Sequence, residues 1–306
     1  MSGLQRPILA RSYLYAPGNV ERILQKVFDA GADAVILDLE DAVPPGKKRE
    51  ARRMVAEVLQ QRKDLEGPRI YVRINSMSTD LWREDLEAVV QTAVHGIRLP
   101  KAESGEQMQV LDRALSEAEE RAGVDRGSLC VVPAVETAVG VLAAAEIAKG
   151  PRAESLGFGV VDFVRDIGVE PDPSGLQTLY AQSYVVLVSR AAGLIPPVAS
   201  VHAQVLDLEG LRATSEAAKR LGFFGRSCIH PSQIPVVHEV FTPSAAQVAE
   251  ARAIVEAFNQ AVAQGSGALA MESGEFVDKP VAERAQALIS LAEGLERLSK
   301  EKSHNS

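Results

Sequence analysis

The sequence predicts a closed (β/α)8 barrel followed by a helical extension, and three observations lead to this fold class. Eight short apolar or β-prone segments recur along the chain, most of them separated by segments of helical composition. Several of the apolar segments lack polar residues on either face, as is typical of buried parallel strands. The chain has 306 residues, which accommodates a barrel of roughly 250 residues and an extension. A doubly wound open sheet is the alternative that this pattern leaves open.

The predicted elements follow one another along the first 242 residues. Strands are expected at 11–15, 34–39, 70–74, 96–99, 131–135, 155–161, 197–201 and 223–229. Helices are expected at 19–30, 47–60, 79–90, 104–121, 176–192 and 208–221, with an Ala-rich helix after residue 136. The seventh strand has the weakest support, because a proline cannot donate a hydrogen bond to a neighbouring strand.

The pattern changes beyond residue 242. An amphipathic helix is expected over 244–263, a flexible Gly-Ser-Gly break follows, and a last helix is expected over 281–298. This extension, residues 243–306, has little apolar core of its own. We therefore expect it to pack on the barrel domain, residues 1–242, or on a neighbouring subunit.

Composition and charge exclude several classes of function. The formal net charge is −8 and no long basic run exists, which argues against a nucleic-acid partner. The two cysteines, Cys130 and Cys228, form no metal or disulfide framework and favour a reducing compartment. Neither a signal peptide nor an apolar run long enough to cross a membrane is recognisable. We expect a soluble, cytoplasmic protein without a membrane partner.

Polar residues gather at the ends of the predicted strands. In chain order they are Tyr15, Glu40, Asp41, Arg73, Lys101, Glu136, Asp162 and His230. The carboxyl ends of parallel strands lie on one face, where α/β proteins bind their ligands. Two carboxylates side by side, Glu136 and Asp162, suit Mg²⁺, which commonly takes one or two carboxylates and leaves its other positions to water and substrate. Each acid alone could instead serve the N-terminus of a helix. We interpret the set as the site of a Mg²⁺-assisted lyase.

Arg73 is the second informative residue. A lone guanidinium at the end of a core strand is costly to bury, and a carboxylate or enolate would satisfy its planar set of donors. Asp38, within the second strand, could simply pair with Lys101 or Arg73.

Two other motifs have weaker functional interpretations. Gly157 to Gly159 begins like a dinucleotide-binding loop, but a third glycine at the required spacing is missing and Asp162 would repel a pyrophosphate. Cys228 and His230 could form a nucleophile pair, although an inert buried cysteine beside a hydrogen-bonded histidine fits better.

These residues lie within motifs that together resemble the HpcH/HpaI aldolase superfamily, and within it the citrate lyase β-subunit-like acyl-CoA lyases. The motifs are RSYLYAPGN at 11–19, LDLEDAVPPGKKREAR at 37–52, VRIN at 72–75, LPKAE at 99–103, VETAVG at 135–140, FGVVD at 158–162, GFFGRSCIHPSQI at 222–234 and GEFVDKP at 274–280. They cover nearly the whole chain, in order.

The resemblance implies roles for individual residues. Glu136 and Asp162 match the family's two Mg²⁺ ligands, so Glu136 is also expected to lie against the substrate. Arg73 matches the arginine that binds the acyl carbonyl and carboxylate. Asp278 matches an aspartate that the extension delivers into a neighbouring subunit's site as the catalytic acid/base.

The resemblance also implies partners. Tyr15, Arg22 and Lys26 fall at positions that contact the acyl-CoA. The family is typically trimeric or hexameric, so a homotrimer or homohexamer is expected. Taken alone, Asp278 would be interpreted as the N-cap of the last helix.

The activity that the resemblance implies is Mg²⁺-dependent cleavage of a citramalyl-, citryl- or malyl-CoA type thioester to acetyl-CoA and a 2-oxo acid. Two alternatives remain open: a pyruvate-dependent class II aldolase acting on free acids, and the β-subunit of a multi-subunit citrate lyase complex. Ala199 stands where relatives commonly carry an aspartate, and this departure bears on which acyl group is bound.

Overall fold

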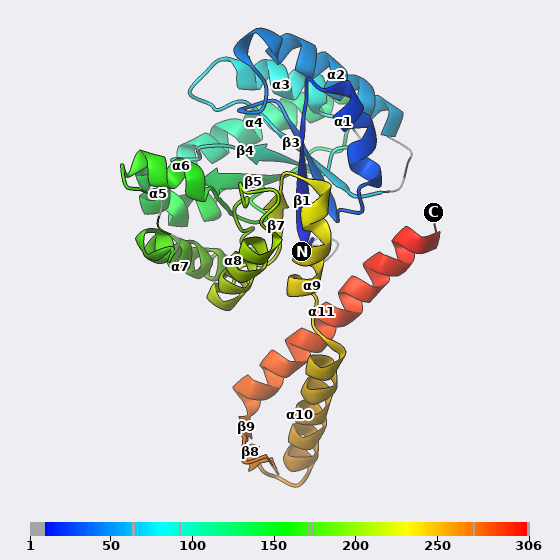
Figure 1. Cartoon of the computed structure of the whole chain (residues 1–306), viewed down its shortest axis with the longest axis vertical. Coiled ribbons are helices and arrows are strands. Elements are labelled where there is room, and N and C mark those ends of the chain that lie inside the picture. Colours follow the sequence, from blue (N-terminus) through cyan, green and yellow to red (C-terminus); the bar gives the residue numbers. More distant parts are fainter. Residues whose placement is uncertain are drawn as a thin grey trace. The chain divides into compact units, whose positions relative to one another are not determined.

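The computed structural model describes residues 10–304, apart from 63, 64, 66, 92, 171, 173 and 272 (Figure 1). The chain divides into two compact units, with the boundary between Glu239 and Val240. In the part of the chain that the structure describes, no helix is both long and apolar enough to cross a bilayer.

The first unit is an α/β fold built on a curled parallel sheet. Within the described residues the sheet has seven strands in the order β6-β5-β4-β3-β2-β1-β7, so neighbours in sequence are mostly neighbours in space. The strands are β1 (Ser12–Pro17), β2 (Ala34–Asp38), β3 (Arg69–Arg73), β4 (Gly96–Leu99), β5 (Cys130–Val135), β6 (Gly157–Phe158) and β7 (Arg226–Cys228). Because all of them are parallel, their carboxyl ends share one face.

The two edge strands, β6 and β7, are both hydrogen-bonded to one short segment. Val198 forms a parallel bridge to Gly157 of β6, and Ala199 forms one to Arg226 of β7. The seventh predicted strand, 197–201, is thus reduced to two bridging residues, in line with the prolines that precede them.

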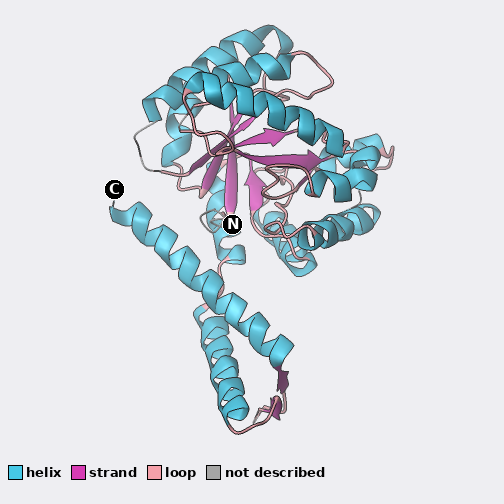
Figure 2. Cartoon of the chain, turned by 180° about the vertical axis from the view of Figure 1, so that it is seen from behind, coloured by secondary structure: helices cyan, strands magenta, loops and turns pink. Residues whose placement is uncertain are grey.

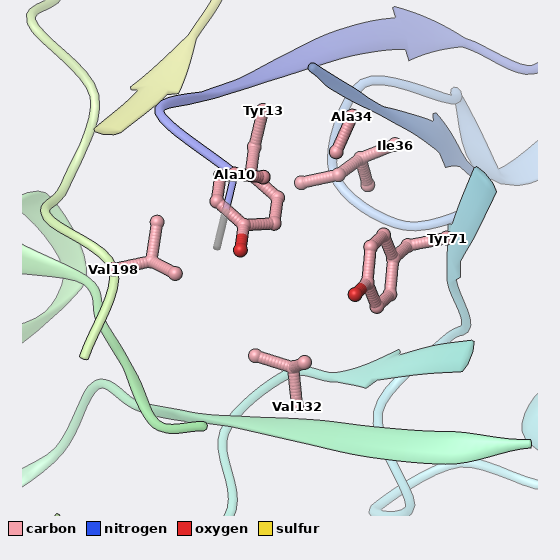
Figure 3. Packing of buried hydrophobic residues seen from close by; sticks show 7 residues of the cluster. All are labelled: Ala10, Tyr13, Ala34, Ile36, Tyr71, Val132 and Val198. Atoms are coloured by element: carbon pink, nitrogen blue, oxygen red, sulfur yellow. The ribbon is translucent and has the colours of Figure 1, made fainter. Parts of the chain in front are cut away.

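The interior of the curled sheet is filled by side chains from several strands. The buried cluster contains Ala10, Tyr13, Ala34, Ile36, Tyr71, Val132 and Val198. Figure 3 shows these side chains converging from the segment before β1, from β1, β2, β3 and β5, and from the bridging segment. The Tyr13 and Tyr71 rings contact each other, with centroids 5.9 Å apart.

Helices lie around the outside of this sheet (Figure 2). They are α1 (Glu21–Lys26), α2 (Lys48–Arg62), α3 (Leu81–Val89), α4 (Gly105–Ala122), α5 (Ala138–Ala148), α6 (Val160–Asp166), α7 (Leu176–Ala191), α8 (Leu208–Leu221) and α9 (Ile234–Phe241). Short 3-10 turns occupy Val27–Asp29, Pro45–Lys47 and Pro231–Gln233. Side-chain caps begin α4 and α5, where Ser104 and Thr137 accept from backbone N–H groups three residues on.

The sixth strand is shorter than the sequence predicts. The predicted strand 155–161 is realised only as Gly157–Phe158, and α6 begins at Val160. Phe163 and Val164 lie three and four residues after Val160 and are buried, whereas Val161 is exposed. This is the spacing of a helix with one apolar face, and it outweighs the run of β-branched residues.

The second unit is a helical hairpin with a small two-stranded sheet. It contains α10 (Ala245–Ala263), β8 (Ala268–Ala270), β9 (Phe276–Asp278) and α11 (Lys279–His304), and β8 pairs with β9 antiparallel. Ser244 and Gln247 form a capping box at the start of α10. The expectation of little core is wrong in part, because Ala251, Ile254, Val277, Ala285 and Ile289 form a buried cluster within this unit.

Candidate active site

An arginine–aspartate pair lies where β2 and β3 end. The Arg73 side chain donates to Asp38 through Nε–Oδ1 and Nη2–Oδ2, each 2.7 Å. Asp38 is fully buried and also accepts from the backbone N–H groups of Glu40 and Ala42, which fixes its carboxylate. Burial acts to lower the pKa of Arg73, but the Asp38 carboxylate opposes it and the pKa is raised well above the ordinary value. Arg73 is therefore a permanent cation held in one orientation.

Glu40 connects this pair to Lys101. Its carboxylate lies 3.1 Å from Arg73 Nη1 and 2.5 Å from Lys101 Nζ. Burial raises the pKa of Glu40, while the two cations act in the opposite direction. Asp41, in contrast, is exposed and lies 3.6 Å from the Lys101 ammonium. The predicted convergence of Glu40, Arg73 and Lys101 is what the structure shows.

Glu136 follows β5 and is the buried acid of the site. It is 7% exposed, and its Oε2 accepts from the backbone N–H of Lys101 at 3.2 Å. Burial, followed by the neighbouring charges of Glu40 and Asp162, raises its pKa to about 7. A carboxylate in such surroundings favours a bound cation, since a cation offsets both the burial and the repulsion.

Backbone conformation makes room for Glu136. A Cβ on Gly159 would lie 2.6 Å from Glu136 Cγ, so only glycine leaves the space. Lys101 adopts φ 48°, in the left-handed region that non-glycine residues rarely occupy. In this conformation the backbone N–H of Lys101 donates to Glu136, and the Lys101 ammonium donates to Glu40. Local strain at such a position is common at functional sites.

Asp162 lies in the first turn of α6, not directly after a strand as predicted. Its side chain is partly exposed and pairs with Arg165 at 2.6 Å. It is close enough to Glu136 to raise the pKa of that residue. Among the described residues no cluster of three or more His, Cys, Asp or Glu could enclose a metal ion. Two carboxylates, of which Asp162 is partly exposed, nevertheless fit Mg²⁺, which keeps water and substrate oxygens as its other ligands.

The positions expected to contact an acyl-CoA lie near the end of β1. The Tyr15 ring is covered by the Arg73 guanidinium, with 4.9 Å from Cζ to the ring centroid. Burial raises the pKa of Tyr15, so its hydroxyl stays protonated. Arg22 and Lys26 are exposed one helical turn apart on α1, and neither is paired with a carboxylate in the described chain.

Asp278 belongs to the second unit, at the end of β9. Its Oδ1 accepts from the backbone N–H of Val281 at 3.2 Å, so it acts as an N-cap of α11.

His230 is exposed and forms a hydrogen bond with Ser232 within its own turn. Cys228 is buried, and burial raises the pKa of its thiol to about 12. The Cys228 and His230 side chains thus offer no nucleophile pair.

The sequence left the partner of Asp38 open between Lys101 and Arg73, and the structure shows Arg73. Sequence reasoning missed two features of the site. One is the space that Gly159 leaves for Glu136. The other is Arg98 on β4, a buried arginine whose Nε has no hydrogen-bond partner. Its signal was available, because a single arginine interrupts an otherwise apolar strand, Gly96–Leu99.

A curled parallel sheet with acids and a fixed guanidinium at its carboxyl face defines an α/β protein with an enzyme-like site. The family model described as HpcH/HpaI aldolase/citrate lyase matches residues 11–231. The chain belongs to this family, in agreement with the motifs found in its sequence.

Individual proteins of known name are similar over almost the whole chain. The citrate lyase subunit beta of Leuconostoc mesenteroides subsp. cremoris is 34% identical over 285 residues, which cover 93% of each chain. The mitochondrial citramalyl-CoA lyase of Homo sapiens is 33% identical over 293 residues, 92% of this chain and 85% of that protein. The crystal structure of CitE from Mycobacterium tuberculosis in complex with magnesium, acetoacetate and coenzyme A is 31% identical. It has a TM-score of 0.76 and covers 93% of this chain and 98% of that one.

Proposed function

We propose that the chain is a Mg²⁺-dependent carbon–carbon lyase that cleaves a carboxylated 3-hydroxyacyl-CoA into acetyl-CoA and a 2-oxo acid. Its family and its relatives support the reaction class, that of a carbon–carbon lyase of oxo acids. One observation carries the proposal: the buried Glu136 carboxylate is linked through Lys101 and Glu40 to the fixed guanidinium of Arg73. A site that combines a cation-seeking acid with a permanent cation suits a substrate with several oxygen anions.

The proposed scaffold is a (β/α)8 barrel. The bridges of Val198 and Ala199 to both edges of the sheet support it, because these residues occupy the place of one more strand. The convergence of side chains from separate strands on one interior supports it as well (Figure 3). In such barrels the ligand binds at the carboxyl ends of the strands, where Glu136 and Arg73 lie.

Glu136 and Asp162 are the residues that would hold the metal. Bound there, Mg²⁺ would act as a Lewis acid on the hydroxyl and carboxylate of the substrate. The CitE structure named above contains magnesium, which is the parallel for this assignment. Gly159 keeps the Glu136 carboxylate in place, and the Lys101 N–H orients it.

Arg73 would stabilise the charge that develops during cleavage. As the hydroxyl loses its proton, the bond between the hydroxyl carbon and the carbon next to the thioester breaks. The electron pair then forms the thioester enolate. Asp38 occupies Nε and one Nη2 donor of Arg73, which leaves other N–H groups for the enolate oxygen. A comparable donor contributes about 3–4 kcal/mol to the transition state. The enolate carbon then takes up one proton, which gives acetyl-CoA. This uptake balances the proton that the hydroxyl released.

Asp278 of a neighbouring subunit would return that proton, within a homotrimer or homohexamer. The surface of the first unit supports an assembly, because large apolar side chains are exposed on three neighbouring helices. They are Val139 and Leu142 on α5, Val161 on α6, and Leu176 and Tyr180 on α7. Apolar patches of this kind mark surfaces that another protein covers.

Arg22 and Lys26 would bind phosphates of coenzyme A. They are exposed cations without a carboxylate partner in the described chain, and they lie just after β1. The aldolase alternative, which acts on free acids, gives these cations no phosphate to bind. Tyr15 would pack against the acyl part, since its ring lies beside Arg73.

A second candidate is favoured by one relative. The similarity to a citrate lyase subunit beta is consistent with a subunit that receives its acyl group within a larger complex. Turnover by the purified chain with a free CoA thioester favours the proposed lyase. Turnover that requires co-purified carrier or transferase subunits favours the complex.

The proposed function is tested by incubating the purified chain with citryl-, citramalyl- and malyl-CoA in the presence of Mg²⁺ or EDTA. We expect acetyl-CoA release from at least one thioester, abolished by EDTA. Absence of acetyl-CoA from all three, with the protein folded and Mg²⁺ present, would overturn the proposal.

A further inference from the structure

Arg98 of β4 lies inside the curled sheet, farther from the carboxyl ends of the strands than the acids of the site. The residue is only 5% exposed. Strand register pairs it with Arg73 of β3 and Val132 of β5, and Val132 is one of the residues that fill the interior (Figure 3). In a parallel sheet, residues in register point to the same face. Arg98 therefore points into the interior from which Arg73 also acts.

The Arg98 guanidinium has no anionic partner in the described part of the chain. Its Nε is buried without a hydrogen-bond acceptor. Five other arginines with buried or half-buried side chains each pair with a carboxylate: Arg11, Arg52, Arg69, Arg73 and Arg152. Arg226 likewise has a buried Nε without an acceptor and no carboxylate partner in the described chain, but its Nη1 donates to Ser215 of α8, whereas no such side-chain acceptor is found for Arg98. A buried guanidinium without an anion is costly, so Arg98 is suited to an anion that the chain itself does not supply.

Gly157 of β6 and Gly159, which directly follows that strand, relate Arg98 to Glu136. A Cβ on Gly157 would lie 2.6 Å from Arg98 Nη2, and a Cβ on Gly159 would lie 2.6 Å from Glu136 Cγ. The two glycines are two residues apart, about 7 Å along an extended chain. The Arg98 guanidinium thus lies about 7 Å farther from the carboxyl ends of the strands than the Glu136 side chain does.

Tyr15 connects the two guanidinium groups. The Arg73 and Arg98 Cζ atoms lie 4.9 Å and 5.9 Å from the centroid of its ring. Arg98 is therefore a second guanidinium beside the ring that Arg73 covers, on the same face of the sheet as Arg73. Unlike Lys101, which is paired with Glu40, it has no carboxylate partner in the described chain. A substrate group that pairs with Arg98 must be anionic to compensate the buried charge.

We propose that Arg98 binds a second substrate carboxylate, carried by a carboxymethyl group on the hydroxyl-bearing carbon. The preferred acyl group is then the citryl type, which releases a dicarboxylic 2-oxo acid. The citramalyl type carries a methyl group there and the malyl type a hydrogen, and both leave the guanidinium without its anion. This inference rests on the proposed lyase function and narrows its substrate.

The test compares citryl-CoA with citramalyl-CoA in the wild type and in Arg98→Met, which retains an unbranched side chain of similar reach without the charge. The wild type should favour citryl-CoA in kcat/KM by about 10- to 100-fold, the range expected for a charged hydrogen bond. Arg98→Met should lose that factor for citryl-CoA and change less than about 3-fold for citramalyl-CoA. Gly157→Ala should produce the same selective loss, because the added Cβ displaces the guanidinium.

A binding measurement provides a readout that is independent of turnover. Calorimetric titration with Mg²⁺ present should show oxaloacetate binding more tightly than pyruvate to the wild type, and the difference should disappear in Arg98→Met. Equal losses for both thioesters, or a wild type that prefers the methyl-bearing substrate, would overturn the inference and leave the lyase function standing. A wild type that cleaves neither of these two thioesters would also overturn the inference, and the lyase function falls with it only if malyl-CoA is not cleaved either.

Discussion

Single residues in this site work because the backbone leaves space for them. The backbone N–H of Lys101 orients the Glu136 carboxylate, and Gly159 leaves the space that the Glu136 side chain occupies. Arg73 is held by both oxygens of Asp38. The charged groups are thus oriented before any ligand arrives, which is the arrangement that electrostatic stabilisation of a transition state requires.

Gly159→Ala tests the space beside Glu136. The added Cβ would meet the glutamate side chain at 2.6 Å and displace it. We expect a loss of about 100-fold in kcat/KM, in line with a 1 Å misplacement of a catalytic group. Calorimetry should show weakened Mg²⁺ binding. Gly46→Ala is the matched control, because a Cβ there meets nothing within 4 Å. Wild-type Mg²⁺ affinity and activity in Gly159→Ala would contradict the role of this glycine.

The pKa of Glu136 predicts a pH dependence of stability in the metal-free chain. Burial first, then Glu40 and Asp162, raise it from 4.5 to about 7. Between these values the folded chain holds a proton that the unfolded chain has released, so stability falls as pH rises from 4.5 through 7. The loss amounts to about 3 kcal/mol.

Urea unfolding of the metal-free chain at about pH 5 and about pH 8 measures this term. Glu136→Gln should remove most of the difference. Glu57→Gln, at an exposed residue of α2, should leave it unchanged. The same pH difference in wild type and Glu136→Gln would show that Glu136 does not titrate as stated.

Elements of the first unit place the site by ending at the same face. β2, β3 and β5 end at Asp38, Arg73 and Val135, and each is followed by polar residues that converge. Behind β3, the loop after Arg73 is fixed by Asp85 of α3. Asp85 accepts from Asn75 and from Arg52 of α2, at 2.7 Å each. This network joins two helices to the end of the strand that carries Arg73.

Asp85→Ala should therefore destabilise the fold. The change leaves Arg52 buried with one partner fewer, and breaking such a buried pair costs about 3–5 kcal/mol. The free energy of unfolding in urea measures the loss. Glu84→Ala is the matched control, because Glu84 pairs with the same Arg52 from an exposed position and should contribute less than about 1 kcal/mol. Equal effects of the two changes would show that burial is not the deciding factor.

Strand ends were predictable from the sequence, whereas contacts across the sheet were not. Arg73, Lys101 and Glu136 could be placed because each follows an apolar run, and apolar runs identify buried strands. Asp162 was expected directly after a strand, because the two valines before it suggest β structure, whereas the burial of Phe163 and Val164 follows a helical period. The partner of Asp38 and the surroundings of Arg98 depend on neighbouring strands, whose register no local pattern specifies.

The whole molecule consists of a unit with the site and a second unit with its own small core. The sequence identified the change of pattern near this boundary but underestimated the apolar cluster, because its residues come from α10, β9 and α11 and are separated along the chain. The homotrimeric or homohexameric assembly and the cytoplasmic location stay predictions. Asp278 gives the assembly a functional consequence, since its proposed role requires a second copy.

Mixing two inactive variants tests the shared site. Arg73→Ala and Asp278→Ala chains, unfolded and refolded together, should recover part of the activity, because mixed assemblies contain some sites with both residues intact. Arg73→Ala mixed with Asp162→Asn is the control and should stay inactive, since both residues belong to the first unit. No recovery in the first mixture would assign the site to one chain and remove Asp278 from it.

Cleavage is proposed to depend on an ion held by Glu136 and Asp162. Acetyl-CoA release is followed while Mg²⁺ is titrated into EDTA-treated wild type, Asp162→Asn and the exposed control Asp125→Asn. We expect saturable activation of the wild type and the control. For Asp162→Asn we expect a loss of at least about 100-fold with the fold retained. Full turnover by Asp162→Asn, or by the wild type in EDTA, would contradict this dependence.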